Sequence, residues 1–318
     1  MSLLLEQVRE AVRTRHYSIR TEEAYIRWVR QYILFCGKRH PSEFGAAEVG
    51  AFVSHLAVGR KVSASTQSQA LSALLFLYRE VLALTIGWVD GVERAQKPKR
   101  LPVVFTREEA RAVLSHLRGE AWLMASLLYV SGLRLMECVR LRVKDLDVAR
   151  LQITVREGKG GKDRFTVLPQ SLAQPLERQL ERARALHEPD LRDGFGHVYL
   201  PYALARKYPA ADREWCWQYV FPARHRSRDP RTGREQRPHI AETALQKAVK
   251  HAVMAAGVPK PGSCHTFRHS FATYLIESGY DIRTVQELPG HASVETTQTY
   301  THVLNKGGRG VRCPLDED

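Results

Sequence analysis

Residues 264–291 read CHTFRHSFATYLIESGYDIRTVQELPGH and decide the fold of the second half of this chain. Ser263 precedes the stretch as a helix N-cap, and Gly279 is the residue type that commonly ends a helix. A helix is therefore expected between them. Its apolar positions recur at helical spacing and predict a buried face made of Phe267, Phe271, Tyr274 and Leu275.

Two side chains that suit phosphate chemistry lie near the start of this helix. His265 and Arg268 are three residues apart, so they share one face. An imidazole beside a fixed guanidinium suits a phosphate, because one moves a proton while the other holds charge. Taken alone, His265 also fits an ordinary core or surface histidine. His269 is expected to be structural, and no metal site is expected because no third ligand follows at motif spacing.

An arginine stands between two apolar helical stretches further upstream. Arg134 lies in the sequence GLRLME, just before a helix expected to begin at Leu135. By itself it is either a surface arginine that pairs with Glu137 three residues on, or a charge presented to a ligand. Both interpretations stay open from these residues alone.

A glycine-rich loop joins two short alternating segments. Residues 152–156 and 165–168 predict an antiparallel hairpin, and its turn GKGGK carries Lys159 and Lys162. Glycines let the backbone approach another molecule closely, although the same turn also fits a flexible hairpin tip. The turn is not a P-loop, because the pattern GxxxxGK[ST] and the helix after it are missing from the sequence.

A second pair of candidate residues follows the predicted helix. Gly290-His291 is followed nine residues later by Tyr300, which alone fits a packed aromatic residue. Pro289 cannot donate a hydrogen bond to the carbonyl of Val285, so the preceding helix is expected to end early.

The whole chain predicts a mainly α fold with a small antiparallel β element, an α+β fold in two domains. Residues 1–91 contain four stretches of helical periodicity and predict a four-helix domain. Residues 92–101, VERAQKPKRL, are basic and predict a linker, either solvated or lying along phosphates through Lys97, Lys99 and Arg100. Residues 102–318 form the second domain.

The charge of this 318-residue chain is strongly positive. Its 48 Lys and Arg residues exceed 34 Asp and Glu residues, for a net charge of +14. Residues 1–100 hold 15 basic and 9 acidic residues, and the remainder holds 33 and 25, so both halves share the excess. This favours a nucleic-acid partner over a membrane, with solubility alone as the alternative. Five scattered cysteines and the absence of an 18-residue apolar run predict a soluble protein of a reducing compartment.

The order and spacing of these candidates resemble the tyrosine recombinase family. Arg134, the lysine hairpin, HxxR, and Gly-His nine residues before Tyr300 agree with its pattern over about residues 102–306. The segments SGLRLMECVRLRVKDLD and REGKGGKDR and residues 264–291 look like the integron integrases in particular. So does an insertion at about residues 193–240, which the wider family lacks. The resemblance implies a SAM-like, DNA-binding N-terminal domain and a C-shaped clamp around DNA.

The resemblance implies roles for six catalytic residues. Tyr300 would attack a DNA phosphate and form a 3′-phosphotyrosyl link, with no metal, nucleotide or other cofactor. Arg134 and Arg268 would hold the nonbridging oxygens, and Lys159 would protonate the leaving 5′-oxygen. His265 would act as the acid/base group, and His291 would hydrogen-bond the phosphate. Pro289, where the family usually has Leu, could displace His291.

The insertion would recognise bases flipped out of a folded single strand, the attC hairpin. Its aromatic residues would stack on bases and its arginines would contact the backbone. The alternative is an aromatic mini-core with a solvated loop. The expected DNA contacts here, beside Lys162 and the linker, are Trp215, Trp217, Tyr219, Arg224, Arg226, Arg228, Pro230 and His239. The usual pair of histidines is here Pro238-His239, which weakens part of this assignment.

The function implied is integration and excision of gene cassettes by recombining attC with duplex attI sites. A homo-tetramer would assemble on DNA through the segment after Tyr300, in the bacterial cytoplasm and associated with the nucleoid. Two alternatives remain: a type IB topoisomerase-like enzyme that nicks without synapsis, and an inactive homologue that only binds DNA. The insertion argues against the first, and the complete set of catalytic residues argues against the second.

Overall fold

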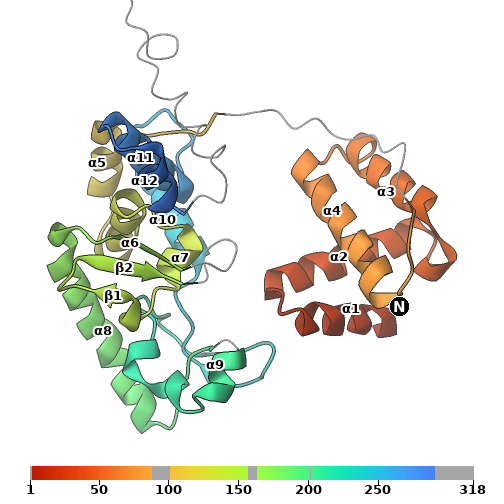
Figure 1. Ribbon diagram of the computed structural model, residues 1–318, viewed down its shortest axis with the longest axis horizontal. Helices are drawn as coiled ribbons and strands as arrows, with labels where there is room; N and C mark the ends of the chain where they lie inside the picture. Colours follow the sequence, from red (N-terminus) through yellow and green to blue (C-terminus); the bar gives the residue numbers. More distant parts are fainter. Residues whose placement is uncertain (1, 88–100, 157–162, 201, 291–318) are drawn as a thin grey trace, which may run out of the picture. The chain divides into compact units, whose positions relative to one another are not determined.

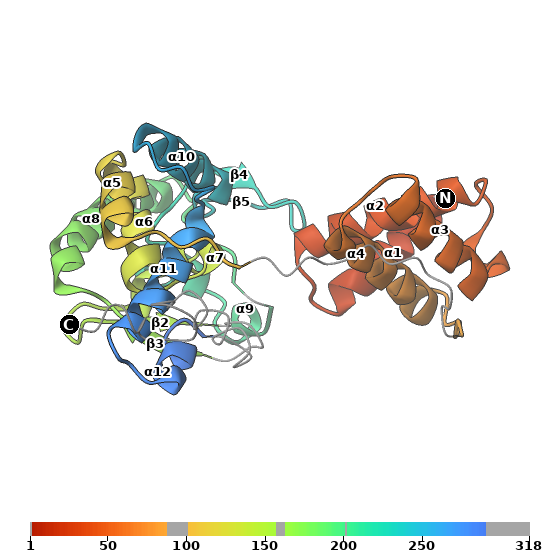
Figure 2. The same ribbon diagram turned by 90° about the horizontal axis from the view of Figure 1, so that it is seen from above.

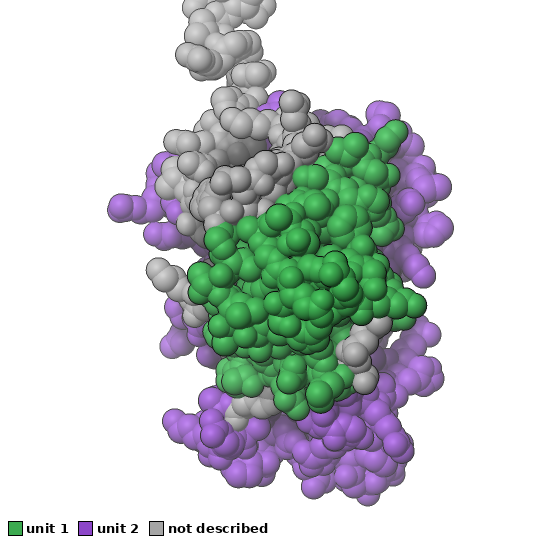
Figure 3. All heavy atoms as spheres, turned by 90° about the vertical axis from the view of Figure 1, so that its right-hand side faces the viewer, with its two compact units in different colours: residues 1–100 green, residues 101–318 purple. Residues whose placement is uncertain are grey.

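The computed structural model describes residues 2–87, 101–156, 163–200 and 202–290. The chain divides into two compact units, residues 1–100 and 101–318, coloured separately in Figure 3. Most of the expected linker, residues 92–101, lies outside the described residues. Each unit is therefore described by itself.

Unit 1 is a bundle of helices, as predicted. Its helices are α1 (Ser2–Thr14), α2 (Ile19–Phe35), α3 (Ala46–Val58) and α4 (Ala64–Phe76), which continues as a π-helical turn, Leu77–Val81. Ser18 and Ser63 cap α2 and α4 by accepting backbone N–H bonds. Tyr32 and Tyr78 are fully buried and join their hydroxyl groups at 2.9 Å, which satisfies both polar atoms inside the core.

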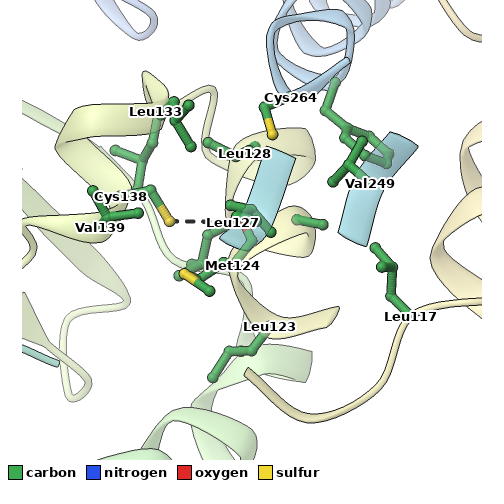
Figure 4. Packing of buried hydrophobic residues seen from close by; sticks show 14 of the residues in the cluster. Leu117, Leu123, Met124, Leu127, Leu128, Leu133, Cys138, Val139, Val249 and Cys264 are labelled. Carbon is green, nitrogen blue, oxygen red and sulfur yellow. Dashed lines mark hydrogen bonds between the residues drawn. The ribbon is translucent and has the colours of Figure 1, made fainter. Parts of the chain in front are cut away.

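Unit 2 surrounds one central helix, α6 (Gly119–Val130), which contacts five other helices (Figures 1 and 2). These are α5 (Arg107–Ser115), α7 (Leu135–Val139), α8 (Ala173–Arg192), α10 (Glu242–Ala255) and α11 (Cys264–Glu277). Because α6 is apolar all round, it is buried from every side. Figure 4 shows Leu123, Met124, Leu127 and Leu128 of α6 in this core, with Cys138 and Cys264 nearby.

A small antiparallel sheet carries the predicted hairpin. It pairs β1 (Leu146–Asp147) with β2 (Gln152–Val155), and β2 with β3 (Arg164–Val167). In this register Val155 faces Arg164, so residues 157–162 connect the two paired ends. The hairpin prediction is confirmed. The first strand was not predicted, because two residues are too short to show an alternation.

Helix α11 begins and ends where its capping residues indicated in the sequence. Ser263 is its N-cap and Gly279, with φ of +82°, follows its end. Phe267, Phe271 and Leu275 are buried as expected, but the prediction for Tyr274 is wrong. Its side chain is 37% exposed because it lies on the outer face, where the Arg107 guanidinium covers the ring at 4.4 Å.

Residues 193–240, the predicted insertion, fold as a small irregular part of unit 2. It contains α9 (Tyr202–Lys207), short turns at Ala211–Arg213 and Trp215–Trp217, and a minimal hairpin of β4 (Ser227–Arg228) and β5 (Glu235–Gln236). A β-bridge between Arg142 and Tyr219 attaches it to the body of the unit. In the described part of the chain, helices long and apolar enough to cross a membrane are absent.

Candidate active site

Arg134 is the N-cap residue of α7, and it makes the pairing with Glu137 that was one of the two interpretations of the sequence. Its backbone N–H and its Nη1 donate to the two carboxylate oxygens of Glu137 at 2.8 and 2.6 Å. Its Nη2 also donates to the carbonyl of Gly290, from the other end of the unit's sequence. The pairing with Glu137 therefore exists, and it aims the guanidinium at the turn before His291.

Arg268 is buried on α11, with a relative exposure of 4%. Its Nη1 donates to the carbonyl of Gly132, two residues before Arg134. Gly132 has φ of +62°, and a Cβ there would overlap the ring of Phe271. Glycine therefore allows the chain to pass close to α11, which brings the segment of Arg134 against the segment of Arg268.

His265 lies within electrostatic range of both charges. Its side chain keeps an exposed edge. Partial burial of the ring, followed by the positive charges of Arg268 and Arg134, lowers its pKa below the usual value. Burial, with His265 and Arg268 beside it, lowers the pKa of His269 to about 4. Both imidazoles are therefore neutral at pH 7, and His265 is an acceptor or donor that a ligand can reach.

A second arginine, Arg164 at the start of β3, shares the carboxylate of Glu137. Its two terminal nitrogens lie 3.0 and 2.7 Å from Glu137 Oε1 and Oε2, and its Nε donates to the carbonyl of Leu288 at 3.0 Å. Burial opposes ionisation of Glu137, but the bonds and charge of Arg164, with those of Arg134, lower its pKa to about 2. Glu137 is therefore a fixed anion between two guanidinium groups.

Both arginines contact the turn that leads to His291. Helix α12 (Ile282–Glu287) is capped by Asp281 and ends at Glu287, two residues before Pro289. This confirms the early end predicted from Pro289. Gly290 then adopts φ of +71° and donates its N–H to the carbonyl of Glu287 at 2.9 Å. Gly290, the last described residue, thus lies beside Arg134, to which its carbonyl is hydrogen-bonded.

The described residues bring together three of the six catalytic candidates, Arg134, His265 and Arg268. The remaining candidates lie outside the described residues: Lys159, His291 and Tyr300, and likewise Lys162, Lys97, Lys99 and Arg100.

Two of the predicted DNA contacts in the insertion are tryptophans with cations on their rings. Lys144 Nζ lies 2.8 Å from the ring centre of Trp217, and the Arg142 guanidinium lies 5.8 Å away. Burial, followed by the charge of Arg156, lowers the pKa of Lys144. Trp215 faces the Arg184 guanidinium at 5.4 Å. Both tryptophans are partly exposed.

Tyr219 and His239 form an edge-to-face pair, with ring centres 5.4 Å apart. Tyr219 is only 5% exposed, so its ring belongs to the small core that was the alternative interpretation of the insertion. His239 is partly exposed, donates from Nδ1 to the carbonyl of Ile240 at 2.8 Å, and accepts at Nε2 from Arg140 Nε at 3.4 Å. Of this pair, His239 is therefore the residue that keeps surface for a ligand.

The arginines of the insertion divide into two groups. Arg226 contacts the carboxylates of Asp190, Asp193 and Glu235, and Arg237 binds Asp190 through two nitrogens. These side chains hold the insertion to the end of α8. The other predicted contacts, Arg224, Arg228 and Pro230, are exposed.

Sequence reasoning missed Arg164, Arg142 and Lys144. Arg164 stood inside the quoted segment REGKGGKDR, yet its partners lie 27 and 124 residues away. A local sequence pattern does not predict contacts between residues so far apart in the chain. Arg142 and Lys144 carried a weak signal, because two basic residues follow α7 at alternate positions.

The arrangement can hold a phosphate. Two guanidinium groups on neighbouring segments supply fixed positive charge, and a neutral imidazole near both can exchange a proton. Within residues 2–87, 101–156, 163–200 and 202–290, no three His, Cys, Asp or Glu side chains gather as a metal site.

Comparison with known proteins identifies the family of this chain. Residues 104–306 match the phage integrase family, and residues 4–88 match its N-terminal SAM-like domain. An integrase/recombinase of Escherichia coli is 53% identical over 313 residues, which cover 98% of this chain and 93% of that protein. Tyrosine recombinase XerD of Mycobacterium leprae is 36% identical over 267 residues, 79% of this chain and 73% of that protein.

Solved structures share the fold. A lambda integrase dimer bound to a COC′ core site has a TM-score of 0.60 at 16% identity and covers 97% of both chains. XerH recombinase bound to a palindromic difH substrate has a TM-score of 0.59 at 19% identity, with 92% of this chain and 79% of that one covered. At these identities the likeness shows the fold alone.

The chain is an enzyme of the tyrosine recombinase class, with a SAM-like helical domain and a mainly helical catalytic domain. It belongs to the phage integrase family, whose members bind DNA and catalyse its site-specific cleavage and rejoining.

Proposed function

We propose that this recombinase is an integron integrase, which inserts and excises gene cassettes by recombining attC sites with attI sites. The observation that carries the proposal is the insertion at about residues 193–240. In this segment Trp217 is partly exposed and lies beside the cations of Lys144 and Arg142, in the same unit as the proposed phosphate site. Stacking and positive charge together suit an unpaired base and its backbone.

In the proposed reaction, the oxygen of Tyr300 attacks the scissile phosphate and forms a 3′-phosphotyrosyl link. The bond to the 5′-oxygen breaks, and Lys159 supplies the proton to that oxygen. A phenol with an ordinary pKa of about 10 is a weak nucleophile at pH 7, so the site must stabilise the charge of the transition state. Arg134 and Arg268 do this at the nonbridging oxygens.

The two histidines have separate roles in this scheme. His265, which is neutral at pH 7, accepts the phenolic proton as the attack proceeds and returns it in the reverse step. His291 hydrogen-bonds the phosphate. The position of residue 290, held by Arg134 through its carbonyl, supports this role because it fixes where the next residue begins.

Substrate choice is assigned to the insertion. Trp217 and His239 would take up a flipped base, Trp215 a neighbouring one, and Arg224 and Arg228 the phosphates around them. Lys144 extends this set, because it already lies on the ring of Trp217. Tyr219 and Arg226 would support the surface from behind, since the first is buried and the second is paired with carboxylates.

The proposal includes assembly and place of action. Four protomers would hold two sites on DNA, with the segment after Tyr300 docked on a neighbouring protomer, in the bacterial cytoplasm at the nucleoid. Lys97, Lys99, Arg100 and Lys162 would contact the duplex arms.

The test uses a folded attC bottom strand with a nick just beyond the expected cleavage point. Loss of the short fragment traps the covalent intermediate, which is read as a denaturant-resistant adduct on a gel. Wild-type protein is expected to form the adduct on the folded strand and much less on the fully paired duplex. Equal adduct on both would contradict the attC assignment.

The alternative function is DNA binding by a catalytically inactive homologue. Pro289 motivates it, because the proline ends α12 early. The hydrogen bonds from Arg134 and Arg164 to carbonyls 290 and 288 argue against it, because they fix the turn after the proline is accommodated. Retained binding of the folded strand without adduct formation would favour this alternative.

A further inference from the structure

The buried ion pair between Arg164 and Glu137 joins three separate parts of the catalytic unit. Arg164 begins β3, directly after the hairpin loop, and Glu137 lies in the first turn of α7. Their side chains are 12% and 11% exposed, and two nitrogen–oxygen contacts of 3.0 and 2.7 Å connect them. The third nitrogen of Arg164 reaches Leu288 O in the turn after α12.

Arg134 is fixed by the same carboxylate. Glu137 accepts from the backbone N–H and from Nη1 of Arg134, so both carboxylate oxygens serve two arginines at once. Two guanidinium groups at such short range repel each other unless an anion separates them. The orientation of Arg134 therefore depends on where Arg164 holds Glu137.

Gly290 fits closely around Arg164. A Cβ at this glycine would lie 2.8 Å from both Cδ and Nε of Arg164, and its φ is +71°. The turn and the arginine therefore occupy complementary space, and the carbonyl of the same glycine accepts from Arg134. One turn is thus held by two arginines that share one carboxylate.

We propose that Arg164 is a positioning residue, which fixes the Arg134 guanidinium and the turn at residues 288–290 through Glu137 and Leu288 O. The inference rests on the proposed phosphate-binding roles of Arg134 and His291. Arg164 itself does not touch the phosphate in this account. Lysine cannot replace it, because one ammonium group cannot span a carboxylate and a carbonyl with the planar fork of arginine.

A stability role alone would look different. Arg237 and Asp190 form an equally buried pair, 12% and 6% exposed, which holds the insertion to α8 and contacts none of Arg134, Glu137 or Leu288. Arg237→Lys is therefore the matched control for the loss of a buried bidentate pair. Arg150→Ala is the control for the loss of a surface arginine in the turn between β1 and β2, since its side chain is 81% exposed.

The experiment compares Arg164→Lys, Gly290→Ala, Arg237→Lys and Arg150→Ala with the wild type at temperatures where each variant is folded. The first readout is the single-turnover rate of adduct formation on the nicked, folded attC strand. Misplacing a catalytic group by about 1 Å costs on the order of 10²-fold in rate, so we expect this loss for Arg164→Lys and Gly290→Ala. Arg150→Ala should stay within about threefold of the wild type.

The second readout separates the phosphate clamp from protonation of the leaving group. A 5′-bridging phosphorothiolate at the cleavage point releases a thiolate, which needs no proton. The loss in Arg164→Lys should persist on this substrate, because the fault lies at Arg134. If the phosphorothiolate substrate restored the full cleavage rate of Arg164→Lys, the inference would be overturned, since Arg164 would then act on protonation of the leaving group.

The third readout needs no DNA. In protein labelled with ¹⁵N-arginine, the paired guanidinium N–H groups of Arg134 should exchange slowly with water in the wild type and in Arg237→Lys, but quickly in Arg164→Lys. Unchanged exchange at Arg134 would overturn the inference. If wild-type protein forms no adduct, the proposed attC function fails, while this measurement still decides whether Arg164 fixes Arg134.

Discussion

Two regions of the catalytic unit use the same device, a buried carboxylate shared by two arginines, for different ends. Glu137 joins Arg134 and Arg164, and Asp190 joins Arg226 and Arg237. At Glu137, each arginine has one nitrogen that does not contact the carboxylate, and this nitrogen donates to a carbonyl in the turn at 288–290. The hydrogen-bond network therefore extends into the proposed phosphate site.

At Asp190 the remaining contacts of the arginines go to the insertion itself. Arg237 donates to the carbonyls of Ala223 and Arg224, and Arg226 contacts Glu235. An arginine-rich sequence is therefore no direct sign of DNA contact. We therefore expect the Glu137 cluster to control the cleavage rate and the Asp190 cluster to control the stability of the insertion.

The largest effect is expected at the phosphate site. Arg268→Lys keeps a positive charge on α11 but loses the guanidinium fork, so cleavage of the nicked strand should fall by at least ~10²-fold. Affinity for the folded strand, measured by fluorescence anisotropy, should change little. A rate within a few-fold of the wild type would remove Arg268 from the proposed clamp.

The second prediction concerns the other cluster. Arg237→Ala leaves Asp190 with one weaker partner, so the free energy of unfolding should fall by about 3 kcal/mol, which urea denaturation measures. The cleavage rate per bound complex should remain near that of the wild type. A large loss of rate without a loss of stability would erase the distinction between the two clusters.

The third prediction is a pH dependence of stability that arises at Glu137. Its pKa of about 2 in the folded state lies below the ordinary value near 4.5, so the folded state favours the ionised form. The resulting stabilisation, roughly 3 kcal/mol, is complete above pH 4.5 and is lost as pH falls toward 2. Glu137→Gln should flatten this acid limb in unfolding curves between pH 5 and 2. An unchanged acid limb would mean that Glu137 is not paired as described.

The smallest effect is expected in the insertion. Trp217→Ala should weaken binding of the folded strand by roughly 1–3 kcal/mol and leave binding of a duplex nearly unchanged. Phe at this position should recover much of the loss, because it keeps a stacking face. Equal losses on both kinds of DNA would assign Trp217 to the core of the insertion.

The fold was predictable where its signals are local. Ser263 and Gly279 marked the ends of α11, and alternation marked β2 and β3. Strand β1 was missed because its two residues carry no period. The burial of Tyr274 was predicted wrongly because it lies at the edge of the apolar helical face. Whether a side chain at such an edge is buried depends on which other elements pack over it, and the sequence of the helix does not show this.

The site was predictable only as a set of residue types. The motifs named Arg134, His265 and Arg268, which the structure places together. The sharing of Glu137 by two arginines was not predictable from the sequence. Arg164 is 27 residues away from Glu137 and 124 residues away from Leu288, its other partner. Likewise, charge alone did not show that Arg226 and Arg237 would meet Asp190, 36 and 47 residues away, instead of DNA.

The most direct test of the central claim is mass spectrometry of the covalent adduct. After denaturation, nuclease treatment and trypsin digestion, the peptide of residues 284–306 is released, and Tyr300 is its single tyrosine. The account predicts a nucleotide joined through its 3′-phosphate to Tyr300, formed on the folded attC strand. A nucleotide on any other residue, or a 5′-phosphate linkage, would contradict it.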